Sequence, residues 1–140
     1  MKFVKVTTKH TDEEIDNIIA QLDEVSFELM LSLYESFKYV EVHNEDKHSV
    51  MYAAIEERQL EKLMLHFIRQ GVDFLYEDIT KSVLYGYIPE LENEEKASTL
   101  KTIIDVFVDE NLDTDTVLDK ISEIGYHKLS ERDKKVLQEH

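Results

Sequence analysis

The stretch SVMYAAIEERQLEKLMLHFIRQG, residues 49–71, decides the fold because its apolar pattern changes phase half-way along. On a helix that turns by roughly 100° per residue, the apolar side chains of its first half share one side: Met51, Ala54 and Ile55. Those of its second half fall on the opposite side: Leu60, Leu63, Met64 and Phe67. The pattern predicts, over residues 49–70, either one helix buried on both sides or two short helices with a turn near Arg58. Gly71 supplies a C-terminal cap in both cases.

The segments before this stretch predict a strand and then helices. Residues 2–8 (KFVKVTT) set apolar residues off against lysines, which is typical of a strand. Thr11, with Glu14 three residues later, forms a capping box and predicts the start of a helix. The buried face of that helix is expected to contain Ile15, Ile18, Ile19, Leu22 and Val25.

Residues 26–38 favour a second helix that Ser26 would cap. Apolar side chains recur there at helical spacing: Phe27, Met30, Leu31, Tyr34 and Phe37. No β-branched residue lies between Ser26 and Tyr39, which argues against a strand, although the odd-numbered apolar residues permit one. Residues 39–42 (YVEV) predict a second short strand.

The middle of the chain predicts a third strand and then a break. Residues 72–80 (VDFLYEDIT) read as the strand, and residues 82–88 (SVLYGYI) fit either a hairpin partner or a short helix. Pro89 and the polar run at 90–95 (ELENEE) make the clearest break in the chain.

Two amphipathic helices and a closing helix are predicted beyond that break. The first has an apolar face of Ala97, Leu100, Ile103, Ile104, Phe107 and Val108, and the second one of Val117, Leu118, Ile121 and Ile124. Gly125 ends the second helix, and Ser130 with Asp133 caps the last one. The apolar pairs Leu118/Ile121 and Val136/Leu137 are expected to close on each other or on the body of the protein.

These patterns predict one helix-dominated α+β domain with two to four short strands, about six helices and a C-terminal helical pair. Residues 1–88 form the α+β body, and residues 89–140 form a helical segment packed on it. A length of 140 residues and a hydrophobic content of 42% fit a single domain with a real core.

The composition narrows the expected partners and location. A net charge of −15 repels phosphate backbones and anionic lipids, so we expect no direct binding to nucleic acid. The chain has neither cysteine nor a long apolar run, so we expect a cytoplasmic protein without membrane insertion. The expected partner is a protein with a basic surface, and the oligomeric state stays open.

The closing segment LDKISEIGYHKLSERDKKVL, within residues 117–138, resembles the short C-terminal segment of some bacterial rhomboid-type intramembrane proteases. The matching positions are Leu118, Asp119, Lys120, Ile121, Gly125, Tyr126, Leu129 and Ser130. The resemblance implies a shared accessory unit, suited to docking. It does not imply proteolysis, because the chain contains no Gly-x-Ser-x-Gly motif.

Residues 49–74 look like a single ankyrin-type helical pair. Met51, Tyr52 and Ala54 stand near its first-helix positions, and the second helix and its glycine correspond to Leu63, Met64, Phe67, Ile68 and Gly71. The turn glycine is replaced by Arg58 and Gln59, and the chain has no second copy, whereas a solenoid needs about three repeats. The resemblance favours the two-helix interpretation of residues 49–70.

Few residues suggest cofactor chemistry. His43 and His48 flank Glu45 and Asp46, which are possible metal ligands, but an exposed polar loop explains them more simply. The carboxylates of residues 113–115 (DTD) fit helix capping better than a calcium loop, because the loop's central glycine and twelfth-position glutamate are missing. We therefore expect no cofactor and no metal.

A cluster of aromatic residues is the strongest indication of a contact surface. Phe74, Tyr76, Tyr85 and Tyr87 lie within fourteen residues, and Glu90 and Glu92 follow as an acidic rim. Tyrosines are enriched at protein interfaces, although tyrosine side chains at the edge of a sheet can also simply cover the hydrophobic core. These residues favour a non-catalytic bacterial interaction module, an adaptor or regulator, that docks a basic protein. The alternatives are an acidic inhibitor or immunity protein that mimics nucleic acid, and a small metal-dependent enzyme built around His43 and His48.

Overall fold

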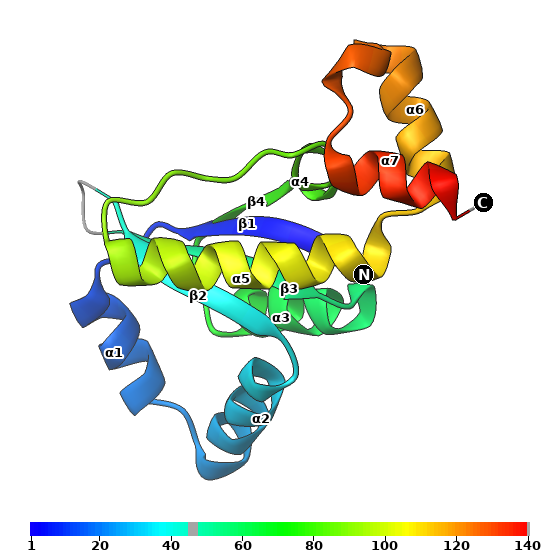
Figure 1. The fold of residues 1–140 in the computed structure, drawn as a ribbon. Coiled ribbons are helices and arrows are strands. Elements are labelled where there is room, and N and C mark those ends of the chain that lie inside the picture. The colour runs from blue at the N-terminus through cyan, green and yellow to red at the C-terminus, as the bar shows by residue number, and fades with distance from the viewer. Residues whose placement is uncertain (45–47, 140) are drawn as a thin grey trace.

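The computed structural model of the protein describes residues 1–44 and 48–139. In this part of the chain, seven α-helices and a four-stranded antiparallel sheet form a helix-dominated α+β domain, as the sequence predicts. The strands are β1 (Lys2–Thr8), β2 (Lys38–His43), β3 (Ser49–Ile55) and β4 (Phe74–Asp78), and their order across the sheet is β2-β3-β1-β4. Figure 1 shows α5 (Glu94–Asn111) lying across one face and α3 (Glu57–Arg69) across the other.

The inner strand β3 has all seven of its residues buried. It pairs with β1 on one side and β2 on the other, and helices cover both of its faces. The prediction of helix for residues 49–55 is therefore wrong. A strand buried on both faces carries apolar residues at every position, so it lacks the alternation by which a half-buried strand is recognised.

Helix α3 starts at the phase change that the sequence shows after β3. The segment 49–70 thus contains a strand and one helix, and the first helix of the ankyrin-like pair is absent there. Gly71, with a φ of 70°, follows the C-cap Gln70, as predicted. The inner face of α3 is Leu60, Leu63 and Phe67, the same stripe that the sequence indicates.

Two hydrophobic clusters, one on each side of the sheet, form the core. The cluster on the α5 side consists of Phe3, Val40, Val50, Tyr52, Ala54, Val83, Leu100, Ile104, Phe107 and Val108. The cluster on the α3 side consists of Val4, Val6, Phe37, Met51, Ala53, Ile55, Leu60, Leu63, Phe67 and Val72. Helix α5 therefore belongs to the main core, although it lies beyond the break at residues 89–93.

The helices α1 (Asp12–Ala20) and α2 (Glu24–Glu35) form a pair that packs loosely beside α3. The Thr11–Glu14 capping box begins α1, as predicted, and the helix predicted over residues 26–38 is confirmed for residues 26–35 but not for Lys38, which belongs to β2. The buried face predicted for the first helix is wrong at Val25, which lies in α2 and is 67% exposed. The predicted cap at Ser26 is wrong, because the Asp23 carboxylate accepts the Ser26 amide hydrogen and caps α2 three residues earlier. Neither helix has a fully buried residue, so this pair contributes only half-buried side chains to the core.

The remaining local predictions in the body concern β2, β4 and the segment that follows β4. β2 contains the predicted YVEV segment, and β4 lies within the predicted third strand. Residues 82–84 belong to a short helix, α4 (Thr80–Leu84), so the hairpin alternative for residues 82–88 is wrong. The acidic run after Pro89 leads into α5, whose cap is Asn93.

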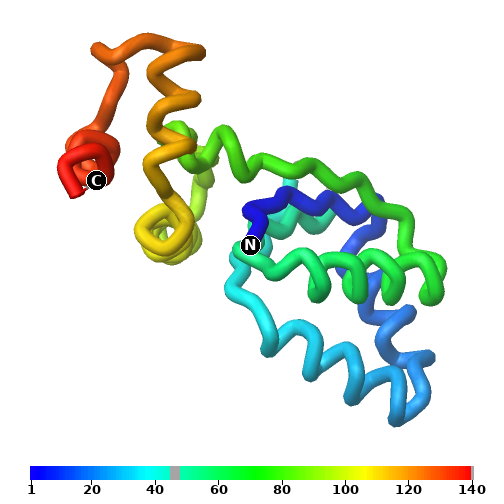
Figure 2. The backbone as a smooth tube through the Cα atoms, turned by 90° about the vertical axis from the view of Figure 1, so that its right-hand side faces the viewer, coloured from blue at the N-terminus to red at the C-terminus, as the bar shows by residue number. Residues whose placement is uncertain are grey.

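The C-terminal helices α6 (Thr114–Ile124) and α7 (Glu131–Gln138) stand together outside the sheet, joined by the 3-10 turn η1 (Tyr126–Lys128). Gly125 ends α6 with a φ of 91°, and the Ser130–Asp133 capping box begins α7, as predicted. The predicted contact of Leu118 is wrong, because that side chain is 51% exposed. Figures 1 and 2 place this pair and the α1–α2 pair at opposite ends of the molecule.

A buried ion pair joins α6 to α7 where an apolar contact was expected. Lys120 and Asp133 are only 3% and 1% exposed, and their Nζ and Oδ2 atoms lie 2.6 Å apart. The same carboxylate oxygen accepts a hydrogen bond from the Ser130 amide at 2.8 Å. Since Val117 and Leu129 are also buried, this small unit has both a charged and an apolar centre.

Candidate protein-interaction surfaces

The aromatic cluster at residues 74–87 is divided between different faces of the molecule. Phe74 lies on the α3 side of the sheet, where its ring centroid is 5.3 Å from that of Phe67. Tyr76 shares this side, because alternate residues of a strand point the same way. Part of the predicted contact surface is therefore an edge of the core.

Tyr85 and Tyr87 lie elsewhere. Tyr85 directly follows α4. The Nζ atom of Lys81 lies 5.5 Å from the centroid of the Tyr85 ring and forms an ion pair with Glu123 of α6 at 2.8 Å. Tyr87 is 52% exposed and lies near Tyr52 on the α5 side. Burial raises the pKa of Tyr52, and the neighbouring Tyr87 adds to that rise.

The predicted acidic rim, Glu90 and Glu92, borders a separate shallow pocket of about 450 Å³. Lys5, Tyr52 and Lys96 also line this pocket. Tyr52 links it to the neighbouring Tyr87, whereas Phe74, Tyr76 and Tyr85 do not line it. Only part of the expected tyrosine-rich surface is therefore gathered in one place.

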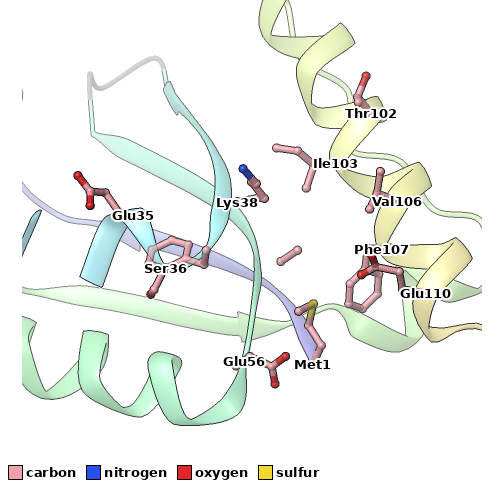
Figure 3. Close-up of a pocket in the computed structure, with 12 residues that line it drawn as sticks. Met1, Glu35, Ser36, Lys38, Glu56, Thr102, Ile103, Val106, Phe107 and Glu110 are labelled. Carbon is pink, nitrogen blue, oxygen red and sulfur yellow. The ribbon is translucent and has the colours of Figure 1, made fainter. Parts of the chain in front are cut away.

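A different hollow combines an apolar floor with acidic walls, and we name it the acidic pocket. It has a volume of about 390 Å³ and lies between the end of α2, Met1 just before β1, the start of β2, the end of β3, and α5 (Figure 3). Its lining residues are Met1, Glu35, Ser36, Phe37, Lys38, Ala54, Glu56, Thr102, Ile103, Val106, Phe107 and Glu110. Its floor is buried at Phe37, Ala54 and Phe107, while Met1 and Val106 remain 46% and 51% exposed.

The charge around the acidic pocket is negative, because carboxylates outnumber lysine among its lining residues. Glu35, Glu56 and Glu110 line the pocket together with a single lysine, Lys38, and none of the four forms an ion pair or side-chain hydrogen bond within residues 1–44 and 48–139. Glu35 is the last residue of α2, and Glu110 is the last but one of α5. Because the C-terminal end of a helix is itself negative, acids at that position destabilise the helix and attract cations.

A third hollow lies between α2 and α3, and we name it the basic groove. Its volume is about 230 Å³, and it is lined by Ser26, Leu29, Leu33, Lys62, Leu65, His66, Arg69 and Gln70. Leu29 is 65% exposed, and Val25, one helical turn before it, is 67% exposed. Burial lowers the pKa of His66 in this groove. An exposed apolar row thus runs beside basic side chains.

The sequence missed both hollows because their residues come from distant segments. The acidic pocket joins residues 1, 35–38, 54–56 and 102–110, which no local pattern connects. The sequence signal for these hollows is the presence of Val106 and Leu29 outside the predicted helical stripes, whereas Val25 belongs to a predicted stripe. Val106 lies off the buried face of α5, and Val25 and Leu29 lie off the half-buried face of α2.

The residues considered for metal binding do not converge in the part of the chain that is described. His43 Nε2 lies 3.4 Å from Asp12 Oδ2, and both side chains are largely exposed. His48 directly precedes β3, and Glu45 and Asp46 lie outside the described residues. Among residues 1–44 and 48–139, no group of three or more possible ligands is placed to hold a metal ion. Asp113 caps α6 through the Thr116 amide, which accounts for that carboxylate.

The chain was compared with protein families, curated proteins and solved structures. No family model, curated protein or solved structure matches it significantly. The resemblance over residues 117–138 therefore stays a prediction, and no family match supports the one over residues 49–74, where strand β3 replaces the first helix of the pair. Of the helices described, none is long and apolar enough to cross a membrane.

Proposed function

We propose that this chain is a protein-interaction module that docks a partner with a basic surface at the acidic pocket. One apolar side chain of the partner enters between Met1, Val106 and Phe107, and flanking lysines or arginines meet the acidic wall. The observation that supports this most strongly is the pairing of an apolar floor with uncompensated carboxylates at two helix C-termini.

The acidic pocket combines the kinds of residue that are typical of protein–protein interfaces. Interfaces combine an apolar centre with a polar rim, and a few anchors in well-packed pockets carry most of the binding energy. A volume of about 390 Å³ can accommodate one large side chain. In this proposal, charge governs the rate of encounter and the apolar anchor governs the lifetime of the complex. The surface differs from the predicted tyrosine-rich one.

The test uses a defined peptide, acetyl-Lys-Lys-Phe-Lys-Lys-amide, titrated into the ¹⁵N-labelled protein and followed by NMR. We expect amide shifts to concentrate at the pocket, for example at Ile103, Val106 and Glu110. The double variant Glu35→Gln/Glu110→Gln should weaken binding about tenfold, because two charge contacts are lost. The same variant should unfold at a slightly higher temperature, because it removes acids from helix C-termini. Weaker binding by a more stable protein excludes misfolding as the cause.

The matched control is Glu90→Gln/Glu92→Gln, which changes the net charge by the same amount at the predicted acidic rim. It should leave the affinity within about twofold. If this control weakens binding and the pocket variant does not, docking occurs at the originally predicted rim. Equal shifts with the glutamate-flanked peptide acetyl-Glu-Glu-Phe-Glu-Glu-amide would contradict recognition of a basic partner.

A further inference from the structure

The basic groove carries a second inference that does not depend on the acidic pocket. Helix α2 exposes Val25 and Leu29 in one row, and Leu33 continues that row into the groove. Leu65 of α3, 44% exposed, forms the opposite wall. Apolar side chains that recur every four residues and remain exposed mark a helix face without a partner.

The charged side chains that line the groove have the reverse sign of the molecule as a whole. Lys62 and Arg69 line the groove in a protein of net charge −15, and neither forms an ion pair within the described residues. A partner that fits must therefore present an apolar helical row with acids beside it. Opposite charges placed across an interface fix its register and exclude other partners.

Helix α2 itself has these properties. Glu24 and Glu28 are one turn apart and form a row beside Val25 and Leu29, since residues three or four apart are neighbours on a helix. Neither glutamate forms an ion pair within the described residues. One molecule therefore carries both the groove and the helix that would fill it.

We propose that the basic groove is occupied by α2 of a second copy of this chain in a two-fold symmetric dimer. Val25 and Leu29 of each copy pack against Leu65 of the other, while Glu24 and Glu28 approach the other copy's Lys62 and Arg69. A two-fold interface is self-complementary, so each contact occurs twice. The two occurrences offset the general repulsion between two acidic molecules.

The first measurement is sedimentation velocity of the protein at increasing concentration. We expect a monomer–dimer equilibrium that Leu29→Asp abolishes. Leu118→Asp is the matched control, because Leu118 is also an exposed leucine on a helix, 51% exposed, outside the groove. It should leave the dimer intact. A wild-type protein that stays monomeric up to about 1 mM, where even a weak dimer would form, overturns the proposal.

A charge exchange tests the geometry itself. Glu24→Lys/Glu28→Lys places basic residues opposite Lys62 and Arg69, whereas Lys62→Glu/Arg69→Glu places acids opposite Glu24 and Glu28. Each variant alone should be monomeric, and an equimolar mixture should form a heterodimer, because both copies of the contact are then complementary. A mixture that stays monomeric would overturn the pairing of α2 with the groove.

Dimerisation through the basic groove and docking at the acidic pocket can be tested independently of each other. The groove and the acidic pocket share no lining residue, so monomeric Leu29→Asp should bind the lysine-flanked peptide as the wild type does. A failure of dimerisation with peptide binding retained removes only the dimer. The converse result removes only the docking at the acidic pocket.

Discussion

Lys120 and Asp133 show how single residues can determine a local structure. Burial works against ionisation of Asp133, but hydrogen bonds from Lys120 and from the Ser130 amide outweigh it and hold the pKa of that carboxyl below its ordinary value. The carboxylate therefore serves the capping box of α7 and neutralises a buried ammonium group of α6. Removing either partner leaves an uncompensated buried charge or an unfilled cap.

Asp133→Asn should destabilise the α6–α7 unit by about 3 kcal/mol, because it leaves the Lys120 ammonium buried without a counter-charge. Hydrogen exchange of the α6 and α7 amides, read by mass spectrometry, measures this local free energy. Lys81→Met/Glu123→Gln is the control, since it removes an exposed pair of similar length, 2.8 Å, and should cost less than about 1 kcal/mol. Equal effects of the two changes would contradict a special role for the buried pair.

The same pair predicts a direction for the pH dependence. Because the pKa of Asp133 is lower in the folded protein, its stabilising contribution is complete above about pH 4, the ordinary carboxyl pKa. It is lost as the pH falls through the folded pKa. Wild-type α6–α7 should therefore open progressively in acid, whereas the Asp133→Asn variant should lack this part of the pH dependence. An identical acid profile in the two proteins would show that another group is responsible.

At the scale of secondary structure elements, the helices differ sharply in how many of their side chains are buried in the core. α5 buries Leu100, Ile104, Phe107 and Val108, whereas α1 and α2 bury no residue completely. Amide hydrogens of α1 and α2 should consequently exchange faster than those of β3 and α5, because few apolar contacts resist their opening. The measurement uses the Leu29→Asp variant, so that self-association does not protect α2. Protection of α2 equal to that of β3 would contradict the loose attachment.

The same contrast explains what could be predicted from the sequence. The capping boxes at Thr11 and Ser130 were recognised because their chemistry lies within four residues. The sequence of β3 predicts a helix because burial on both faces removes the period-two signal. The tyrosines lie close together in sequence, which predicts one surface. The chain nevertheless ends β4 and enters α4 between them, so Tyr76 lies in the sheet and Tyr85 lies beside Lys81 at the end of α4. Local rules identify elements, whereas long-range packing assembles surfaces.

At the scale of the whole molecule, two surfaces of opposite local charge lie in one acidic body. The acidic pocket collects carboxylates from α2, α3's start and α5, and the basic groove displays Lys62 and Arg69 beside α2. Helix α2 borders both, with Glu35 at its end in the pocket and Leu29 in the groove. The proposed dimer would present two acidic pockets, so a partner with two basic anchors would gain affinity from the linkage of the two sites.

The net charge of −15 predicts a specific kinetic behaviour for docking at the acidic pocket. The field of the whole molecule attracts a basic peptide over a range set by the Debye length, about 10 Å at 0.1 M salt. Raising the salt from about 0.05 to about 0.5 M should lower the association rate constant of a fluorescent lysine-flanked peptide about tenfold or more. The dissociation rate constant should change far less, because the apolar anchor at Val106 and Phe107 is insensitive to screening. Stopped-flow fluorescence provides both constants. A serine-flanked peptide should show no such fall in association, and a salt effect confined to dissociation would mean that short-range contacts, rather than the field of the molecule, control the encounter.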